Sequence, residues 1–194
     1  MRCTRLFAVV AAAAWLALAG PAPLSGQDKN DKVTCQIIYV PTPQPVVDKM
    51  LDMAKVTDKD IVFDLGCGDG RVVATAAKKY GAKGIGVDID PERIKDSNET
   101  VKKQGVEKLV EIRQGDALKV KDLEKGTVVL LYMLDEFMEK LEPQMKKRLK
   151  PGTRIVAHDY PFPNMDPDQT VEFEVGGARP KYLYLWTIRE AKKK

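Results

Sequence analysis

The sequence predicts an α/β fold in which helices cover both faces of a doubly wound, mostly parallel sheet. Short apolar runs alternate with amphipathic helical segments along most of the chain, and a glycine-rich turn joins one such run to a helix. Residues 171–189 have the pattern of a closing hairpin. Alternation of strands and helices is typical of parallel sheets, because each parallel strand needs a crossover connection.

The length and composition are those of one globular domain. The chain has 194 residues, of which 44% are hydrophobic and 31% are charged. The net charge is +4, but Arg2, Arg5 and the lysines at 192–194 lie near the termini, so the folded part is close to neutral. We therefore expect no nucleic-acid partner, since nucleic acids bind clustered basic faces. A monomer is expected.

The cysteines and the single histidine form no disulfide or metal-binding pattern. Cys3 lies near the N-terminus, Cys35 stands alone in a polar segment, and Cys67 lies inside the glycine turn, where a small side chain fits. His158 has no cysteine or second histidine at a ligand spacing. We expect no metal site.

Residues 1–26 have the features of a secretory signal peptide. Two arginines precede an apolar run at 6–19, which ends in an Ala-Leu-Ala cleavage pattern. The run is shorter than the roughly 20 residues that span a membrane. An uncleaved membrane anchor and a misassigned start codon are the alternatives. We expect an exported or membrane-anchored protein, with the side of the membrane left open. Residues 27–36 are then a flexible lead-in, and 37–190 form the folded domain.

The folded domain is expected to begin with an extended segment and a helix. Pro41 and Pro43 forbid a helix before residue 44 and favour an extended course. Thr42 is expected to cap the following helix at 44–55, which carries a proline in its first turn.

The remaining elements follow from hydrophobic periodicity and from proline and glycine boundaries. The expected strands are 61–63, 84–88, 109–113, 127–133, 154–158, 171–175 and 181–189, and the expected helices are 72–80, 91–103 and 136–150. Pro143 is expected to interrupt or restart the last helix. The result is five β-α repeats closed by a hairpin.

The glycine turn after the first strand has the spacing of a cofactor-binding loop. Gly66, Gly68 and Gly70 fall on alternate positions after Asp64. A dinucleotide fingerprint needs a small residue at position 71, where Arg71 stands instead. The pattern resembles that of class I S-adenosylmethionine-dependent methyltransferases, in which the loop backbone approaches the methionine part of the cofactor. The alternative is a tight turn without a ligand.

Acidic residues at two further strand ends fit the same cofactor. Asp88 is placed to accept hydrogen bonds from both ribose hydroxyls. Its alternative role is to cap the next helix, a position that Asp90 already fills. Asp116 and Ala117 match a turn that in class I methyltransferases lies at the amine and ring of adenine. The alternative for Asp116 is a solvated turn aspartate.

A narrower resemblance covers the segments on either side of this region. Tyr-Val-Pro-Thr-Pro at 39–43, Asp-Leu-Gly-x-Gly-Asp-Gly-Arg at 64–71 and Asp-Tyr-Pro-Phe-Pro at 159–163 resemble small single-domain methyltransferases with an apolar N-terminus. That group includes bacterial proteins with leaders and the mitochondrial, membrane-anchored enzymes that methylate lysines of the adenine nucleotide translocase and of the ATP synthase c-ring.

The resemblance implies a Rossmann-like sheet of seven strands with the last one antiparallel, and S-adenosylmethionine as the cofactor. It also implies that Tyr39 and Thr42 lie over the cofactor; the alternative is a segment that only packs on the domain. The predicted cofactor-binding residues are Tyr39, Thr42, Asp64, Gly66, Cys67, Gly68, Asp88, Ile89, Asp116, Ala117 and Tyr132.

The methyl acceptor is less well defined. The fourth strand ends in Tyr-Met-Leu-Asp-Glu, not in the Asn/Asp-Pro-Pro-Tyr of amide-nitrogen and adenine methyltransferases. Asp135, His158 and Tyr160 are the candidate catalytic residues, because they follow strand ends where ligands of such sheets bind and could accept a proton. Asp135 has the alternative role of a helix cap, and His158 that of a buried histidine satisfied by hydrogen bonds.

Three functions are therefore in competition. The first is methyl transfer from S-adenosylmethionine to a protein lysine, as the relatives imply. The second is methylation of a small molecule, with Tyr182, Tyr184 and Trp186 walling an apolar pocket. The third is an exported S-adenosylmethionine-binding protein without catalysis, because this cofactor is made in the cytosol.

Overall fold

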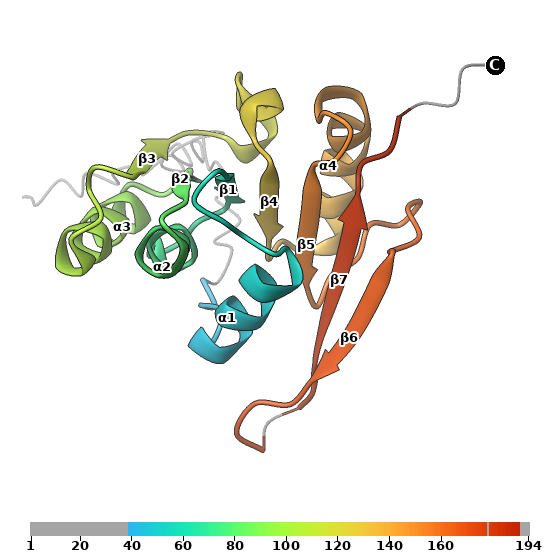
Figure 1. The fold of residues 1–194 in the computed structure, drawn as a ribbon, viewed down its shortest axis with the longest axis horizontal. Helices are drawn as coiled ribbons and strands as arrows, with labels where there is room; N and C mark the ends of the chain where they lie inside the picture. Colours follow the sequence, from blue (N-terminus) through green and yellow to red (C-terminus); the bar gives the residue numbers. More distant parts are fainter. Residues whose placement is uncertain (1–38, 178, 191–194) are drawn as a thin grey trace, which may run out of the picture. The chain divides into compact units, whose positions relative to one another are not determined.

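The computed structural model describes residues 39–177 and 179–190, which alternate helices and strands (Figure 1). The elements are α1 (Gln44–Met53), β1 (Ile61–Leu65), α2 (Arg71–Tyr80), β2 (Lys83–Asp88), α3 (Pro91–Gln104), β3 (Val110–Gln114), β4 (Val128–Leu131), α4 (Asp135–Arg148), β5 (Arg154–His158), β6 (Gln169–Phe173) and β7 (Lys181–Thr187). The predicted leader at 1–26 and lead-in at 27–36 lie outside these residues. Within the described ranges, no helix is long and apolar enough to cross a membrane.

The seven strands form one sheet in the order β3-β2-β1-β4-β5-β7-β6. Neighbours among β1 to β5 pair in parallel, and β7 runs antiparallel to both β5 and β6. The predicted Rossmann-like, seven-stranded sheet with its last strand antiparallel is confirmed. The chain builds outward from β1 to β3 and then returns to β4 on the other side of β1. Ligands of open α/β sheets bind at such a reversal, at the carboxyl ends of the strands.

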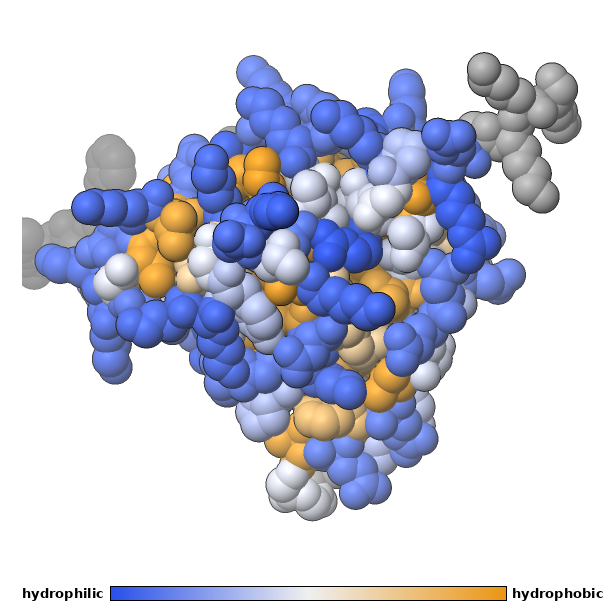
Figure 2. All heavy atoms as spheres, in the orientation of Figure 1, coloured by the Kyte–Doolittle hydropathy of each residue, from blue (hydrophilic) through white to orange (hydrophobic). Residues whose placement is uncertain are grey.

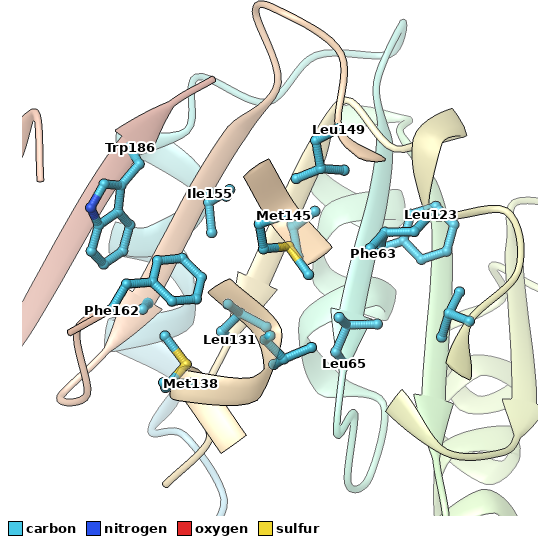
Figure 3. Close-up of a cluster of buried hydrophobic side chains, with 14 of the residues drawn as sticks. Phe63, Leu65, Leu123, Leu131, Met138, Met145, Leu149, Ile155, Phe162 and Trp186 are labelled. Atoms are coloured by element: carbon cyan, nitrogen blue, oxygen red, sulfur yellow. The ribbon is translucent and has the colours of Figure 1, made fainter. Parts of the chain in front are cut away.

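Helices cover both faces of the sheet, because successive side chains of a strand point to opposite sides. Val128 of β4 packs in the cluster that includes α1 and α2, whereas the next residue, Val129, packs in the cluster that includes α4. Figure 3 shows Met138 and Met145 of α4 in this second cluster, with Trp186 at its edge. These clusters are buried, and most of the surface that Figure 2 shows is hydrophilic.

Helix α2 approaches the sheet closely at Gly84 of β2. A Cβ atom at this position would lie 2.8 Å from Cβ of Val73 and 3.1 Å from its carbonyl oxygen. The absence of a side chain therefore lets α2 rest directly on the backbone of β2.

The prediction of five β-α repeats is wrong in two places. Between β3 and β4 the chain forms two short 3-10 turns, Ala117–Lys119 and Leu123–Lys125, and the side chain of Asp116 caps the first of them. Between β5 and β6 it forms no helix. Three prolines at 161, 163 and 167 lack the N–H that a helix needs there.

The predicted break at Pro143 is also wrong, because α4 continues through this residue. The carbonyl that loses its donor belongs to Glu139, an exposed residue, where water can replace the missing bond. Other boundaries shift by a few residues. The strand predicted at 127–133 ends at Leu131, the strands predicted at 171–175 and 181–189 end at Phe173 and Thr187, and the helix predicted at 44–55 ends at Met53.

The contact at Gly84 gives a test of the packing. Gly84→Ala should lower the free energy of unfolding by about 1–3 kcal/mol, because the added methyl group overlaps Val73. Urea unfolding of the full chain measures this change. Gly115→Ala is the control, since a Cβ there would meet only Val87, at 4.0 Å. Equal stability of the two variants would contradict the close packing of α2 on β2.

Candidate functional site

The glycine loop lies at the carboxyl end of β1. The N–H groups of Gly66 and Cys67 both donate to the carbonyl of Val87 in β2, at 2.8 and 3.0 Å. Gly66 and Gly68 have φ values of +82° and +56°, which side chains rarely adopt. Sδ of Met133 and the ring of Tyr39 occupy the space that a Cβ at these two glycines would enter. Because these glycines have no side chain, Met133 and Tyr39 can pack directly on the loop backbone.

Cys67 contributes its backbone to this loop, while its thiol faces the interior. The residue is 4% exposed, and its Sγ lies 3.6 Å from Oγ of Ser97 in α3. Ser97 in turn donates to the carbonyl of Gly68 at 2.7 Å. Burial raises the pKa of the Cys67 thiol, which therefore stays protonated.

Asp64 is a buried carboxyl group near the end of β1. The residue is 5% exposed, and its side chain makes no hydrogen bond within the described residues. Burial and the nearby charges of Asp88 and Asp69 raise the pKa of Asp64 to about 8. No positively charged group of the described residues pairs with Asp64. A ligand that carries an ammonium group would supply one.

Asp88 links the glycine loop to the end of β2. Its Oδ2 accepts from the N–H of Gly68 at 2.9 Å, and its Oδ1 accepts from the N–H of Asp90 at 3.0 Å. Asp90 caps α3 by accepting from the N–H of Glu92 at 2.8 Å, so the capping alternative for Asp88 is wrong. Ile89 beside it is 69% exposed and offers an apolar surface at this edge.

Asp116 and Ala117 lie just beyond β3. Oδ1 of Asp116 accepts from the N–H of Leu118 at 2.9 Å, and its Oδ2 lies 3.1 Å from Nζ of Lys119. The Leu118 N–H lowers the pKa of Asp116, so this carboxylate is ionised. Ala117 begins the 3-10 turn that Asp116 caps.

The segment at 39–42 crosses the glycine loop. Pro43 is the N-cap of α1, so the prediction that Thr42 caps this helix is wrong. The Thr42 side chain instead reaches β5, where its Oγ1 lies 3.3 Å from Nδ1 of His158. Tyr39 covers Gly68, and the guanidinium of Arg93 lies 4.8 Å from the centre of its ring.

His158 is fully buried at the carboxyl end of β5. Its ring stacks on Tyr132, with centroids 4.0 Å apart, and the ring of Tyr160 lies 6.0 Å from Tyr132. Nε2 of His158 has no hydrogen-bond partner in the described part of the chain and lies 3.6 Å from Oδ2 of Asp159. Burial lowers the pKa of His158 to about 4, so the ring is neutral at physiological pH. The alternative of a buried histidine satisfied by hydrogen bonds is therefore only half correct, because Nδ1 has a hydrogen-bond partner and Nε2 has none among the described residues.

Asp159 fixes the end of β5 to the start of β7. It adopts a left-handed backbone conformation, with φ +61°, which reverses the chain direction between His158 and Tyr160. Its carboxylate accepts from the N–H of Tyr182 at 3.0 Å and from the side chains of Arg179 and Lys181 at 2.8 and 3.3 Å.

Asp135 is exposed in the first turn of α4. The N-cap of this helix is Leu134, and no side chain caps it, so the capping alternative for Asp135 is not what the structure shows. The structure also contradicts the prediction that Trp186 helps to wall a small-molecule pocket. Trp186 is 2% exposed, packs against Phe162 at 4.9 Å and donates to the carbonyl of Met165, which makes it part of the core.

Several residues of this region were missed by sequence reasoning. Ser97, Arg93 and Met133 contact the predicted site residues or the glycine loop, and none of them was among the predicted site residues. Within residues 39–177 and 179–190, no group of three or more histidine, cysteine, aspartate or glutamate side chains is placed to hold a metal ion.

Known proteins share this arrangement. A family model described as the ANTKMT methyltransferase domain matches residues 64–169. A "Protein-lysine N-methyltransferase" of Saccharolobus islandicus is 42% identical over 79% of this chain and 95% of its own length. A lysine N-methyltransferase of Xenopus laevis, named for the c-subunit of ATP synthase, is 31% identical over 67% of this chain but only 56% of its own length.

The chain is also similar to a solved structure that contains S-adenosyl-L-homocysteine, the product that S-adenosylmethionine leaves after methyl transfer. The RNA methyltransferase from Salinibacter ruber in complex with S-adenosyl-L-homocysteine matches with a TM-score of 0.73 and 44% identity. The match covers 80% of this chain and 97% of that chain.

The burial of His158 predicts a pH dependence of stability. Its pKa falls from 6.5 to about 4 on folding, so below pH 6.5 the unfolded chain binds a proton that the folded chain does not. The free energy of unfolding should therefore decrease as the pH drops towards 4, by about 2 kcal/mol from this group at pH 5. Urea unfolding at pH 7 and pH 5 measures the change.

The control is His158→Gln, which cannot titrate. Its stability should fall less than that of the wild type between the two pH values, whatever its stability at pH 7. An equal fall in both proteins would assign the pH dependence to other groups.

Proposed function

Because the chain belongs to the ANTKMT methyltransferase domain family and is an S-adenosylmethionine-dependent methyltransferase, we propose that it methylates lysine side chains of a protein. The names of two relatives, from Saccharolobus and Xenopus, support a protein lysine as the acceptor. The name of the Salinibacter structure points instead to RNA. The charges around the site are the observation that separates these two acceptors.

The first turn of α4 carries two exposed carboxylates, Asp135 and Glu136, at the carboxyl edge of the sheet. Neither forms an ion pair with another described residue. These two unpaired negative charges attract a lysine ammonium and repel an RNA phosphate, whereas the cations at this edge, Arg179 and Lys181, are paired with Asp159. These two carboxylates, which follow Tyr132 by three and four residues at the end of β4, are the observation that carries the proposal.

The cofactor half of the site fits S-adenosylmethionine. We propose that Asp64 binds the ammonium of its methionine part, because this buried carboxylate has no partner of its own among the described residues. The loop backbone at Gly66 and Gly68 would lie against the methionine carbons. Asp88, already aimed at the loop, would accept from the ribose hydroxyls.

We place the adenine ring at the end of β3, as the family resemblance implies. Ile89 would pack on the ring, and Asp116 with the Ala117 N–H would bond its edge. Tyr39 and Thr42 would cover the cofactor from the opposite side and exclude water. When bound, S-adenosylmethionine supplies a methyl group that its sulfonium has already activated.

The acceptor lysine must reach this site as a neutral amine. We propose that it lies along the rings of Tyr132 and Tyr160, which form one wall at the end of β4 and β5. Asp135 and Tyr160 are the candidates to take its proton, directly or through water, because an acceptor can reach them. His158 is fully buried beneath Tyr132 and would act by holding that ring and Thr42 in place.

The Asp64 assignment predicts proton release on cofactor binding. In the free protein the pKa of Asp64 is about 8, whereas an ammonium partner requires the ionised form. S-Adenosylhomocysteine has an α-amino group with a pKa of about 8, so its affinity should be highest near pH 8 and fall roughly tenfold per unit below it. Calorimetric titration at pH 6.5, in buffers of different ionisation heat, should show about one proton released.

The matched variant is Asp64→Asn, which cannot titrate. It should bind S-adenosylhomocysteine weakly and without proton release. An affinity of the wild type that stays constant between pH 6.5 and pH 8 would remove the Asp64–ammonium pairing.

The acceptor proposal is tested with methyl-labelled S-adenosylmethionine and two probes, a whole-protein extract and total RNA. Label should enter the protein fraction, and mass spectrometry should place it on lysine Nζ. Asp135→Asn with Glu136→Gln should reduce the initial rate at low acceptor concentration roughly threefold or more, because two attracting charges are lost.

The control pair is Asp58→Asn with Glu107→Gln, two exposed carboxylates that precede β1 and β3 at the other edge of the sheet. These changes should leave the rate unaltered. Label in RNA and not in lysine would refute the proposed acceptor.

A further inference from the structure

Arg71 has no role in the cofactor contacts proposed above, although it occupies the position where a dinucleotide loop needs a small residue. It is the first residue of α2, and its guanidinium bonds two different parts of the chain. Nε lies 2.9 and 3.0 Å from the two carboxylate oxygens of Asp69, and Nη2 lies 2.5 Å from one of them. Nη1 donates to the carbonyl of Thr42 at 3.0 Å.

The segment that Arg71 holds also contacts the loop at its other end. A Cβ built at Gly68 would lie 2.3 Å from a ring carbon of Tyr39, so this ring rests on the loop backbone. The N–H of Asp69 donates to the Tyr39 hydroxyl at 3.3 Å. Asp69 is therefore shared, with its backbone bonded to Tyr39 and its carboxylate bonded to Arg71.

We propose that Arg71 is a positioning residue for cofactor binding, which acts by fastening segment 39–42 across the glycine loop. It does so without touching the cofactor, and the inference rests on the proposed cofactor site. The planar guanidinium suits this task, because two of its nitrogens face one carboxylate while the third remains for a carbonyl. A lysine has one nitrogen and cannot hold both partners in this fork geometry.

A purely structural role for Arg71 makes a different prediction. The Arg71 and Asp69 side chains are 29% and 23% exposed, and ion pairs with this much solvent contact add little to the stability of a fold. If Arg71 served only the fold, its loss would leave cofactor affinity unchanged. If it fastens the segment, affinity must fall while stability changes little.

The test uses full-length Arg71→Gln and calorimetric titration with S-adenosylhomocysteine. We expect the dissociation constant to rise roughly tenfold, the effect of losing a charge-assisted hydrogen bond. KM for S-adenosylmethionine should rise by a similar factor while kcat stays within about twofold, because the segment orders the cofactor site and not the transfer step.

Arg148→Gln is the matched control. Arg148 also bonds one carbonyl and one carboxylate, of Lys121 at 2.8 Å and Glu124 at 3.2 Å, and its side chain is 25% exposed. It ends α4, at the edge of the sheet away from the glycine loop. Its loss should leave the affinity for S-adenosylhomocysteine unchanged.

Two further variants keep the test decisive. Arg71→Lys preserves the charge and should still weaken binding, which covers the case in which Arg71→Gln does not fold. Tyr39→Phe removes the hydroxyl that accepts from Asp69. Its effect combined with that of Arg71→Gln should be smaller than the sum of the single effects, since both act through one segment.

Wild-type affinity in both Arg71 variants, equal weakening by Arg148→Gln, or strictly additive effects with Tyr39→Phe would each overturn the inference. These outcomes do not depend on the result of the acceptor experiment. Failure of the wild type to methylate lysine leaves the Arg71 result standing, whereas an Arg71 variant with normal affinity leaves the acceptor result standing.

Discussion

A carboxylate buried without a hydrogen-bond partner of its own in the described chain is the constraint around which the site is built. Asp64 lies near the end of a central strand, where protein contacts give it neither a cation nor an N–H donor. Burial is the main reason that the pKa of Asp64 rises to about 8, and the negative charges of Asp88 and Asp69 add to the effect. Such a group is costly in the free protein and favourable only when a cation is bound.

Asp64 differs in this respect from the two acidic residues near it. Both oxygens of Asp88 accept backbone N–H groups, and Asp69 is paired with Arg71. In the free protein Asp64 is mostly protonated at pH 7, because its pKa is about 8, and it carries a charge only once that proton is lost.

The cofactor was predicted correctly from sequence, and the residues predicted to bind it were chosen from local determinants. The glycine spacing, the capping by Asp90 and the acidic strand ends all lie within a few residues of the turns that they shape. The seven-stranded sheet with its last strand antiparallel followed from the family resemblance and was confirmed. The two 3-10 turns after β3 were not predicted, because three residues are too few to show a hydrophobic period.

The contacts around the ends of β4 and β5, where we place the methyl acceptor, could not be predicted from sequence, because they join distant parts of the chain. Thr42 was expected to cap the helix next to it, yet its hydroxyl pairs with His158, 116 residues away in sequence. Trp186 has the alternation of a pocket wall but closes the core under Phe162. The same division fits the relatives, which share a methyltransferase fold but are named for different acceptors.

Gly68 has a consequence for how this enzyme can change over evolutionary time. The residue meets two independent requirements, a φ of +56° and a Tyr39 ring that fills its Cβ position. Trimming Tyr39 would clear the space, but an L-residue would still bear about 1 kcal/mol or more of backbone strain. No single second-site substitution can therefore compensate for a change at Gly68. The exposed positions Leu134 and Asp135 are under neither requirement and are freer to vary.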